Sequence, residues 1–301
     1  MKVLLSGGTG FLGRPLASRL VQAGHTVVLL TRNPERVDAR LAPGVTAVAF
    51  GPGKAPTTAE CAGASALINL AGEPVAQRWT AEHKRRMHGS RVETTTALVA
   101  FAKELGTVRS FISASAVGFY GTQQVGPLDE SAPPGTDFLA QVCREWETAA
   151  RAAEALSIRT VILRLGVVLH PEGGALKPLL TQFRLGTGGA VGTGAQYVSW
   201  IHREDAVALF LFALEQTAAS GVLNATAPSP VTNRTFAHAL GHALHRPSVF
   251  TVPAFILRAA LGEMSMVILQ GQQVLPKRAL ELGFTFRFPQ LEGALENLLA
   301  G

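Results

Sequence analysis

A glycine-rich turn near the start of the chain constrains the fold more than any other feature of the sequence. Gly7, Gly10 and Gly13 stand between a short apolar run, residues 2–6, and a segment with apolar residues at helical spacing, residues 14–20. The first glycine allows a tight turn, the second lets the backbone approach a pyrophosphate, and the third lets the helix lie close to the sheet. The free N–H groups at the start of the helix then face the anion.

The segment that follows completes a strand–helix–strand unit. Gly24 ends the helix, and residues 26–30 form a second buried strand, so the unit closes within about thirty residues, as a dinucleotide-binding fingerprint requires. An ordinary strand–helix turn without a ligand is the alternative interpretation. The strand before the turn and the helix after it favour cofactor binding by the turn. The residues expected to contact the cofactor are Gly7, Thr9, Gly10, Phe11, Leu12 and Gly13.

The end of the second strand distinguishes NAD from NADP. An acidic side chain there would accept a hydrogen bond from the ribose 2′-hydroxyl of NAD. This chain has Arg32 at that point and no carboxylate before Glu35. A guanidinium pairs bidentately with a 2′-phosphate and stacks on adenine. Arg32 therefore predicts NADP (NADPH), and a solvated loop charge is the alternative.

Composition limits the class of protein and its partners. The 301 residues are 47% hydrophobic and 16% charged, which predicts a compact soluble protein with a sizeable core. The net charge is +6, but Lys and Arg are scattered, and the densest group, residues 84–86, has no interleaved aromatic residues. We therefore expect no nucleic-acid partner, and we interpret the charge as a solvated surface that also attracts phosphorylated ligands.

Cysteine usage and the terminal sequence bear on the compartment. Cys61 and Cys143 are far apart and lack metal-ligand spacing, so we expect free thiols, no metal and a reducing compartment. The N-terminus leads directly into a strand and leaves no room for a signal peptide. The apolar stretch 255–269 carries Arg258 and Glu263 and is too short for a membrane span. These features predict a cytoplasmic protein without a membrane partner.

Strands and helices alternate as far as residue 165. The pattern predicts an α/β fold, a Rossmann-type doubly wound parallel sheet with a smaller, mainly helical C-terminal lobe. Further strands are expected at 45–50, 64–70, 108–114 and 160–165, and helices at 34–40, 80–103 and 137–156. We divide the chain into an NAD(P)-binding domain, a substrate-side lobe and a C-terminal helical domain: 1–165, rejoined by parts of 195–226; 166–246; and 247–301.

Two further strand exits fall at the edge where an open parallel sheet binds its ligands. The fourth strand ends in small residues that let the backbone approach a cofactor, and a plain strand–helix turn is the alternative. The fifth strand ends in residues 113–121, which are dense in hydroxyls and small side chains. We predict cofactor contacts here from Leu70, Ala71, Gly72 and Ser113.

These stretches resemble the short-chain dehydrogenase/reductase superfamily in its extended, epimerase-like form. The matching segments are Gly7–Gly13, Asn69–Gly72, Ser113–Gly121 and Trp200–Ala206. The chain is more closely similar to the atypical epimerase-family oxidoreductases that carry their own short C-terminal domain. Residues 69–74, 113–121, 138–147 and 252–289 bear this closer resemblance, which spans nearly the whole chain.

The resemblance implies a catalytic pair that this chain lacks. The superfamily has a tyrosine that exchanges the hydroxyl proton, and a lysine four residues later that lowers the tyrosine pKa and holds the ribose. Alignment on Glu147 places Leu139 and Cys143 at these positions. Leucine carries no proton, and cysteine cannot supply the fixed ammonium charge that would depress a phenol pKa from about 10.

Other residues are candidates to replace that pair. Ser115 matches the family's carbonyl-polarising hydroxyl, and Tyr120 can serve as the acid provided that it points into the cleft. Arg91 matches a helix position that faces the cofactor in the larger family and is the candidate cation. A packed aromatic at the strand exit is the alternative for Tyr120, and a surface charge is the alternative for Arg91.

Three other residues have weaker indications. Glu73 and Trp79 follow the second small-residue turn and are candidates to line the substrate pocket. His202 is expected to order its loop rather than to perform acid/base chemistry.

Two functions are consistent with these patterns. The first is an NADP-dependent oxidoreductase or epimerase acting on a small carbonyl, hydroxyl or nucleotide-sugar compound. The alternative is an NADP-binding regulatory or sensor protein with little or no turnover. In either case the expected partner is a small molecule, and the chain is a monomer or a homodimer.

Overall fold

A single parallel sheet organises the N-terminal part of the chain. The computed structural model describes residues 1–37, 44–51, 53–122 and 126–300. Seven strands pair in the order β13-β7-β5-β4-β1-β2-β3. Their bounds are Lys2–Ser6 (β1), Thr26–Thr31 (β2), Val45–Ala49 (β3), Ala64–Asn69 (β4), Ser110–Ala116 (β5), Arg159–Leu165 (β7) and Gly221–Ala225 (β13). The order runs outward in both directions from β1, so the predicted doubly wound Rossmann-type fold is confirmed.

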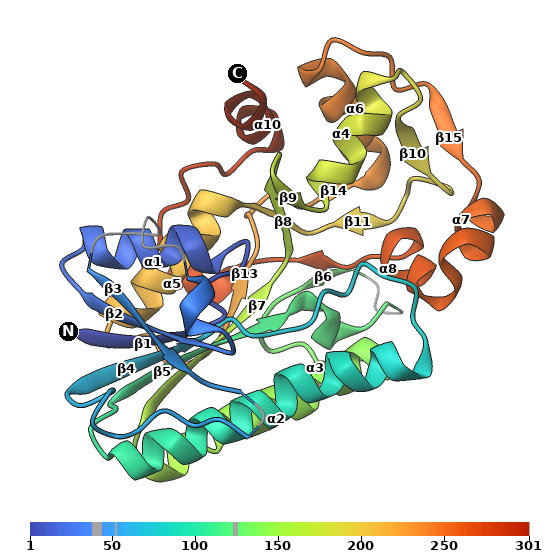
Figure 1. The fold of residues 1–301 in the computed structure, drawn as a ribbon. Helices are drawn as coiled ribbons and strands as arrows, with labels where there is room; N and C mark the ends of the chain where they lie inside the picture. Colours follow the sequence, from blue (N-terminus) through green and yellow to red (C-terminus); the bar gives the residue numbers. More distant parts are fainter. Residues whose placement is uncertain (38–43, 52, 123–125, 301) are drawn as a thin grey trace.

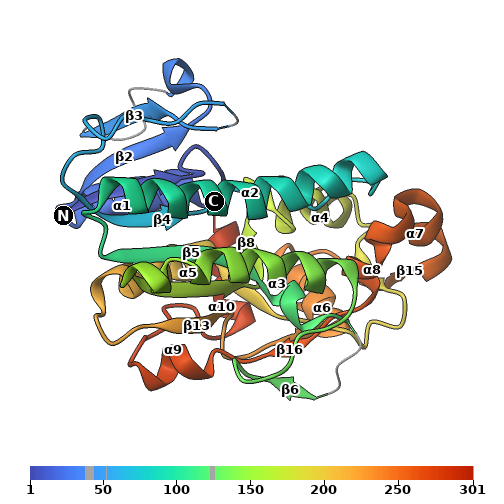
Figure 2. The same ribbon diagram turned by 90° about the horizontal axis from the view of Figure 1, so that it is seen from below.

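Helices cover both faces of the sheet (Figure 1, Figure 2). One face packs against α1 (Gly13–Gln22) and α5 (Arg203–Glu215), and the other against α2 (Ala81–Leu105) and α3 (Phe138–Arg151). Alternate residues of one strand serve the two cores, since Leu5 joins the first and Leu4 the second. Because both faces are buried, the strands read as continuous apolar runs rather than as alternating patterns.

Some element boundaries differ from those expected. The fifth strand was predicted at 108–114 but runs from Ser110 to Ala116, because its backbone pairs with β7 from Ser110 opposite Arg159 to Ala116 opposite Leu165. The helix expected at 137–156 ends at Arg151 and is followed by a 3-10 turn, Glu154–Leu156. Of the helix expected at 34–40, Pro34–Arg36 form a 3-10 turn, and residues 38–40 lie outside the described residues.

The chain after β7 builds a second lobe, which Figure 1 shows above the strand ends. Its small sheets are β8 (Val167–His170), β9 (Gly173–Gly174) and β12 (Trp200–His202); β10 (Gly189–Val191) with β15 (Phe250–Val252); and β11 (Tyr197–Val198) with β14 (Val231–Thr232). Its strand β16 (Gln273–Val274) pairs with β6 (Pro127–Leu128), which lies between β5 and α3 in the sequence. Its helices are α4 (Leu176–Arg184), α6 (Asn233–Ala243), α7 (Ala254–Leu261), α8 (Met266–Leu269), α9 (Lys277–Glu281) and α10 (Leu291–Leu299). The 3-10 turn η4 (Gly262–Ser265) also belongs to this lobe, whereas the 3-10 turn η2 (Val117–Tyr120) directly follows β5.

The strand β13 connects the C-terminal lobe to the main sheet. This strand pairs in parallel with β7, so residues 221–225 belong to the main sheet. Across the part of the chain that the structure describes, none of the helices combines the length and the apolar character needed to cross a bilayer.

Candidate functional site

The glycine turn after β1 brings backbone against backbone. A Cβ atom at Gly13 would overlap the carbonyl oxygen of Gly7, and one at Gly7 would lie 2.6 Å from the carbonyl carbon of Leu70. Gly7 also has a φ of 75°, which favours glycine. The turn therefore joins the exit of β1 to the exit of β4, two of the strand ends that sequence analysis assigned to the cofactor.

The outer side of this turn fits a diphosphate. Thr9 and Gly10 are exposed, and among the described residues a Cβ at Gly10 would meet only the carbonyl oxygen of Gly7 within 4 Å. The N-cap residue of α1, Leu12, makes no side-chain capping hydrogen bond. Within the first turn of α1 the N–H of Arg14 donates to the carbonyl of Gly10 at 3.1 Å, and Pro15 has no N–H. The helix dipole still favours negative charge at this end of α1.

Phe11 links the turn to the C-terminal lobe. Its ring lies against the β8–β9 hairpin, where a Cβ at Gly173 would approach it to 2.6 Å. The guanidinium of Arg203 lies 5.6 Å from the centre of the same ring. The first turn of the dinucleotide fingerprint is therefore held from both lobes.

Arg32 follows β2 directly and is exposed beside the glycine turn. Its strand pairs with β1 up to Leu30, opposite Ser6, which is the last residue before the turn. Its aliphatic stem packs against Gly51, where a Cβ would lie 3.0 Å from Arg32 Cγ. The structure thus places this guanidinium at the edge where sequence analysis expects the adenosine ribose.

The exit of β4 is shaped by Asn69, to which sequence analysis assigned no role. Its side-chain Nδ2 donates to Thr95 Oγ1 of α2 at 2.9 Å, and its Oδ1 accepts from the backbone N–H of Ala71 at 3.0 Å. Asn69 is fully buried, so both bonds are shielded from water. An asparagine at a strand end before small residues is the local signal that indicates such a turn.

Arg91 reaches this turn from α2. Its guanidinium donates to the backbone carbonyls of Glu73 and Met87, each at 3.0 Å, and lies 5.3 Å from the centre of the Trp146 ring. A Cβ at Gly72 would lie 3.2 Å from its Cζ. Burial lowers the pKa of Arg91 from its ordinary value. The structure therefore places a fixed guanidinium at the β4 exit, rather than on the open surface.

Cys143 replaces the superfamily's lysine and faces the exit of β5. A Cβ at Gly118 would lie 3.7 Å from its Sγ and 3.4 Å from Leu139 Cβ. Burial, reinforced by the nearby carboxylate of Glu147, raises the pKa of the Cys143 thiol to about 12. The thiol is therefore neutral at physiological pH, and Arg91 supplies the charge near this position.

Ser115 and Tyr120 lie in a buried polar network that sequence analysis missed. Arg164 of β7 and Glu147 of α3 form a bidentate ion pair with two contacts of 2.8 Å. Ser115 donates to Glu147 Oε1 at 2.7 Å, and Arg164 Nη1 donates to the Tyr120 hydroxyl at 2.9 Å. Sequence analysis assigned Arg164 only to an apolar strand. A charged residue within such a strand indicates that a buried partner of opposite charge lies nearby.

The position of Tyr120 corrects its expected role as an acid that points into the cleft. Its side chain is fully buried, and its hydroxyl donates to Asn224 Oδ1 at 2.7 Å while accepting from Arg164. Burial raises the pKa of Tyr120 above its ordinary value, which makes proton release harder. Ser115 is also only 1% exposed, and its single hydroxyl proton is given to Glu147.

Ser113 is likewise enclosed, and its hydroxyl donates to the backbone carbonyl of Ala114 at 3.1 Å. Glu73 is half-buried beside the β4 exit, with its carboxylate 3.8 Å from the Arg86 guanidinium. Trp79 is only 8% exposed, and its indole N–H donates to the carbonyl of Val75 at 3.0 Å. Trp79 therefore exposes little of its side chain to a substrate pocket.

The segment Trp200–Ala206 holds the two lobes together. His202 is the N-cap of α5, where its Nδ1 accepts from the N–H of Glu204 at 3.1 Å and its ring stacks on Phe288 at 3.9 Å. Asp205 accepts from the backbone N–H groups of Arg287 and Phe288, each at 2.9 Å. This geometry supports an ordering role for His202.

The burial of His202 predicts a loss of stability in acid. Burial lowers its pKa from 6.5 to about 4, so between these values the unfolded chain binds a proton that the folded protein does not. The free energy of unfolding should therefore fall by about 3 kcal/mol as the pH drops through this window. His202→Asn keeps a capping acceptor and should flatten this part of the pH profile, measured by urea unfolding from pH 7 to pH 4. His242→Asn, at an exposed histidine, is the matched control. Equal profiles for both variants would contradict the prediction.

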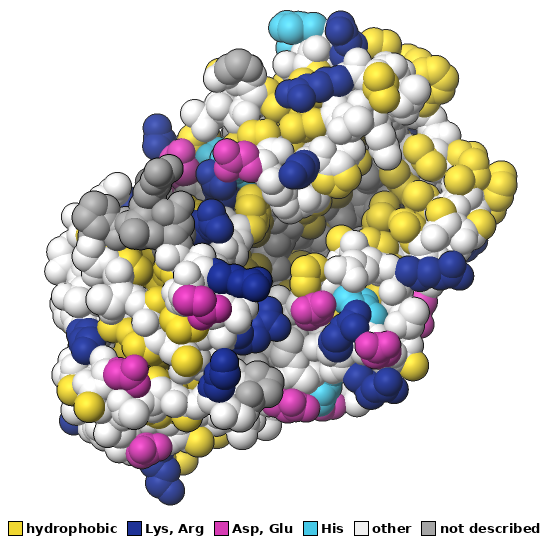
Figure 3. Space-filling model, viewed as in Figure 1, with side chains coloured by type: hydrophobic (Ala, Val, Ile, Leu, Met, Phe, Trp, Pro, Cys, Tyr) yellow, Lys and Arg dark blue, Asp and Glu magenta, His cyan; other side chains and the backbone are white. Residues whose placement is uncertain are grey.

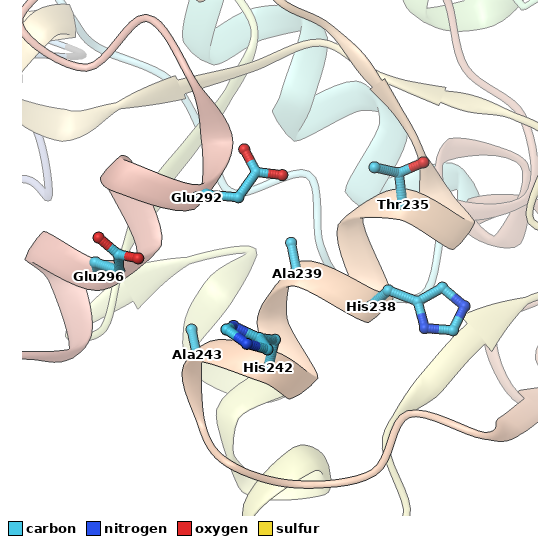
Figure 4. Close-up of a pocket in the computed structure, with 7 residues that line it drawn as sticks. All are labelled: Thr235, His238, Ala239, His242, Ala243, Glu292 and Glu296. Carbon is cyan, nitrogen blue, oxygen red and sulfur yellow. The ribbon is translucent and has the colours of Figure 1, made fainter.

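The surface is hollowed between the strand ends and the C-terminal lobe (Figure 3). A second depression, a groove of about 280 Å³ between α6 and α10, lies within the C-terminal lobe, lined by His238, His242, Glu292 and Glu296 among others (Figure 4). Over the described ranges of the chain, no group of three or more His, Cys, Asp or Glu side chains is arranged to hold a metal ion. The glycine turn, Arg32 and the turn that Arg91 contacts each follow a strand of the main sheet at its carboxyl end.

This sheet order and the turn between β1 and α1 define an NAD(P)-binding Rossmann fold of the short-chain dehydrogenase/reductase type. Residues 3–225 match the NAD dependent epimerase/dehydratase family, and residues 252–298 match a domain of unknown function (DUF1731). The chain belongs to this epimerase family, and the predicted resemblance is confirmed.

Several relatives are similar over nearly their whole length. The chain is 41% identical to the epimerase family protein SDR39U1 homolog, chloroplastic, of Arabidopsis thaliana, over 99% of this chain and 87% of that protein. It is 39% identical to the epimerase family protein YfhF of Bacillus subtilis, over 100% and 98%. A crystal structure of human SDR39U1 (isoform 2) with NADPH superposes with a TM-score of 0.86 and 34% identity, covering 100% and 99% of the two chains.

Proposed function

We propose that this protein binds NADP(H) and acts as an oxidoreductase or epimerase on a small carbonyl or hydroxyl compound. The observation that carries the proposal is the exposed Arg32 guanidinium beside the glycine turn, where a 2′-phosphate gains a bidentate partner and no carboxylate repels it. The human SDR39U1 structure with NADPH, at 34% identity over the whole chain, supports the same cofactor.

In this proposal each strand exit would hold a part of the cofactor. The turn Gly7–Gly13 and the N-terminus of α1 would hold the diphosphate, and Arg32 the adenosine 2′-phosphate. Leu70–Gly72 would line the nicotinamide end, toward Arg91 and the exit of β5. When bound, the cofactor supplies or accepts a hydride.

Arg91 takes the role of the fixed cation in this proposal. Its two backbone hydrogen bonds use one N–H on each terminal nitrogen and hold the guanidinium still. A guanidinium has five N–H donors, so it retains donors for negative charge that develops on a ligand oxygen near Gly72. The buried polar network of Ser115, Glu147, Arg164 and Tyr120 supports the site, because it fixes the exit of β5 against α3 and β7.

The burial of Ser115 and Tyr120 favours the second function, an NADP-binding sensor with little or no turnover. Both hydroxyls are committed to partners inside the protein, so neither is free to exchange a proton with a ligand. NADPH oxidation in the presence of carbonyl compounds separates the two functions. Sustained turnover supports the enzyme, and tight cofactor binding without turnover supports the sensor.

Arg32→Ala should lower the affinity for NADPH by about 10- to 100-fold, because a charge-assisted pair contributes about 1.5–3 kcal/mol. The affinity for NADH should fall much less, since NADH lacks the 2′-phosphate and loses only the stacking of the guanidinium on adenine. Isothermal titration with both cofactors measures the ratio. Arg19→Ala, which removes an exposed arginine from the last turn of α1, is the matched control. An unchanged NADPH/NADH ratio in Arg32→Ala would remove the basis for NADP.

A further inference from the structure

An apolar cluster adjoins Arg91, which the proposed function assigns to the ligand, because the carbonyl that Arg91 Nη1 contacts belongs to Met87 of this cluster. Trp79, Met87 and Met264 form its buried part. Six further apolar side chains pack on them while keeping part of their surface exposed: Val75, Phe138, Leu139, Leu261, Met266 and Ile268. We call these nine residues the apolar cluster. Partly exposed members give it a surface as well as a core.

The cluster is assembled from segments far apart in the sequence. Val75 and Trp79 follow the exit of β4, Phe138 and Leu139 begin α3, and Met266 and Ile268 belong to α8. Lys84 of α2 connects η4 with the start of α3, because its Nζ lies 2.5 Å from Glu263 Oε2 and 4.8 Å from the centre of the Phe138 ring. The C-terminal domain therefore supplies one wall of this surface.

The position of the cluster relates it to the reacting end of the cofactor. Leu139 lies where alignment places the superfamily's tyrosine, and it faces Gly118 just after β5. Val75 comes three residues after Gly72, against which Arg91 packs. A ligand beside Arg91 and the exit of β5 thus meets methyl and thioether groups where a phenol hydroxyl would otherwise stand.

Exposed hydrophobic side chains extend the apolar surface beyond the apolar cluster, and we call this extension the rim. Of the eight large hydrophobic side chains that are exposed in the described residues, five lie in β15, α7, α8 and the residue before β15: Val249, Phe250, Phe255, Ile256 and Val267. Figure 3 shows hydrophobic side chains gathered beside the hollow on this side of the molecule. Apolar surface that gathers at one place marks a binding site more often than scattered residues do.

We propose that the site takes a carbonyl compound whose carbon skeleton is apolar, an aryl or branched hydrocarbon, and not a nucleotide-sugar; the inference rests on the proposed function. A nucleotide-sugar brings hydroxyls and a diphosphate whose hydrogen bonds to water must be replaced. The apolar cluster offers no such partners and instead gains from covering hydrocarbon. Arg91 then binds the ligand's oxygen, and the cluster binds the rest of it.

The test uses the full chain with and without saturating NADPH and three probes: 2-naphthaldehyde, glyceraldehyde and UDP-glucose. Isothermal titration is expected to show that 2-naphthaldehyde binds at least ten-fold more tightly than either polar probe. The paired variant Met266→Gln and Ile268→Thr should weaken 2-naphthaldehyde about ten-fold, with NADPH affinity unchanged. Leu280→Thr, at a side chain of α9 that is 48% exposed and lies outside both the cluster and the rim, is the matched control and should change neither affinity.

Three results would overturn the inference: tighter binding of UDP-glucose, no binding of 2-naphthaldehyde, or an equal loss in the paired variant and in Leu280→Thr. The cofactor titration keeps the two proposals apart. If NADPH fails to bind while 2-naphthaldehyde still binds in a manner sensitive to Met266 and Ile268, the proposed cofactor is wrong and the ligand class stands. Circular dichroism of each variant shows that the comparison is made between folded proteins.

Discussion

Gly13→Ala is expected to abolish tight NADPH binding and to lower the free energy of unfolding by about 3 kcal/mol. The added methyl overlaps the carbonyl oxygen of Gly7 and would lie 2.6 Å from the Cα of Gly8, so it meets backbone and not a side chain that can rotate away. Overpacking of this kind typically costs about 1–3 kcal/mol, and rigid backbone places it at the upper end. The turn must open to admit the methyl, which moves the N–H groups that face the diphosphate.

Gly293→Ala is the matched control, because Gly293 also lies in a helix, and among the described residues nothing lies within 4 Å of its Cβ position. This substitution should stabilise the protein by up to about 1 kcal/mol, since glycine weakens a helix interior relative to alanine. Urea unfolding and NADPH titration of both variants make the comparison. If Gly13→Ala bound NADPH like the unchanged chain, the turn would not be the diphosphate site.

Glu147→Gln is expected to reduce the free energy of unfolding by about 3–5 kcal/mol, because it leaves the buried Arg164 guanidinium without a counter-charge. The two side chains are only 5% and 4% exposed, so the guanidinium that remains is largely shielded from bulk water. The change also weakens the acceptor for the Ser115 hydroxyl. Such a loss is a large part of the total stability of a typical domain.

Glu154→Gln tests the same chemical change on the surface. Glu154 lies 3.6 Å from Arg151, and both side chains are about half exposed at 48% and 44%. Exposed pairs contribute little, so the expected change is within about 0.5 kcal/mol. Urea unfolding at pH 7 without cofactor measures both variants. Equal small losses would show that the Glu147–Arg164 pair does not hold α3 to the sheet.

The paired substitution Glu147→Leu with Arg164→Met separates charge from packing. Replacing both members of a buried ion pair by apolar side chains is often neutral or stabilising. Recovery of most of the stability in this variant, together with loss in Glu147→Gln, would identify the uncompensated charge as the cause. The result would also show whether Tyr120 keeps its position without the hydrogen bond from Arg164.

The local pattern of the sequence was sufficient to propose the cofactor half of the site. Gly7, Gly13 and Arg32 act through backbone conformation and through their place at strand ends, and strand ends follow from the alternation of apolar segments. Once the sheet is known to be parallel, its order brings the exits of β1, β2 and β4 to one edge. These residues could therefore be proposed before any side-chain contact was known.

Side-chain partners across the fold decided the rest. Ser115, Glu147, Arg164, Tyr120 and Asn224 come from five separate segments, and nothing in their spacing indicates that they share one buried network. The direction of the Tyr120 hydroxyl depends on Arg164, 44 residues later, and on Asn224, 104 residues later. Sequence alone therefore left its catalytic and packing roles equally open.

The sequence by itself determined the doubly wound sheet, the turn that fits a diphosphate and the absence of the Tyr–Lys pair. Only the tertiary structure decided that Tyr120 is enclosed, that Arg91 lies against Gly72, and that the C-terminal α8 meets Leu139 in one apolar surface. The physical reason is the range of the interactions. Turns and strand patterns are fixed by neighbouring residues, whereas burial and ion pairing depend on which distant segments exclude water from the same place.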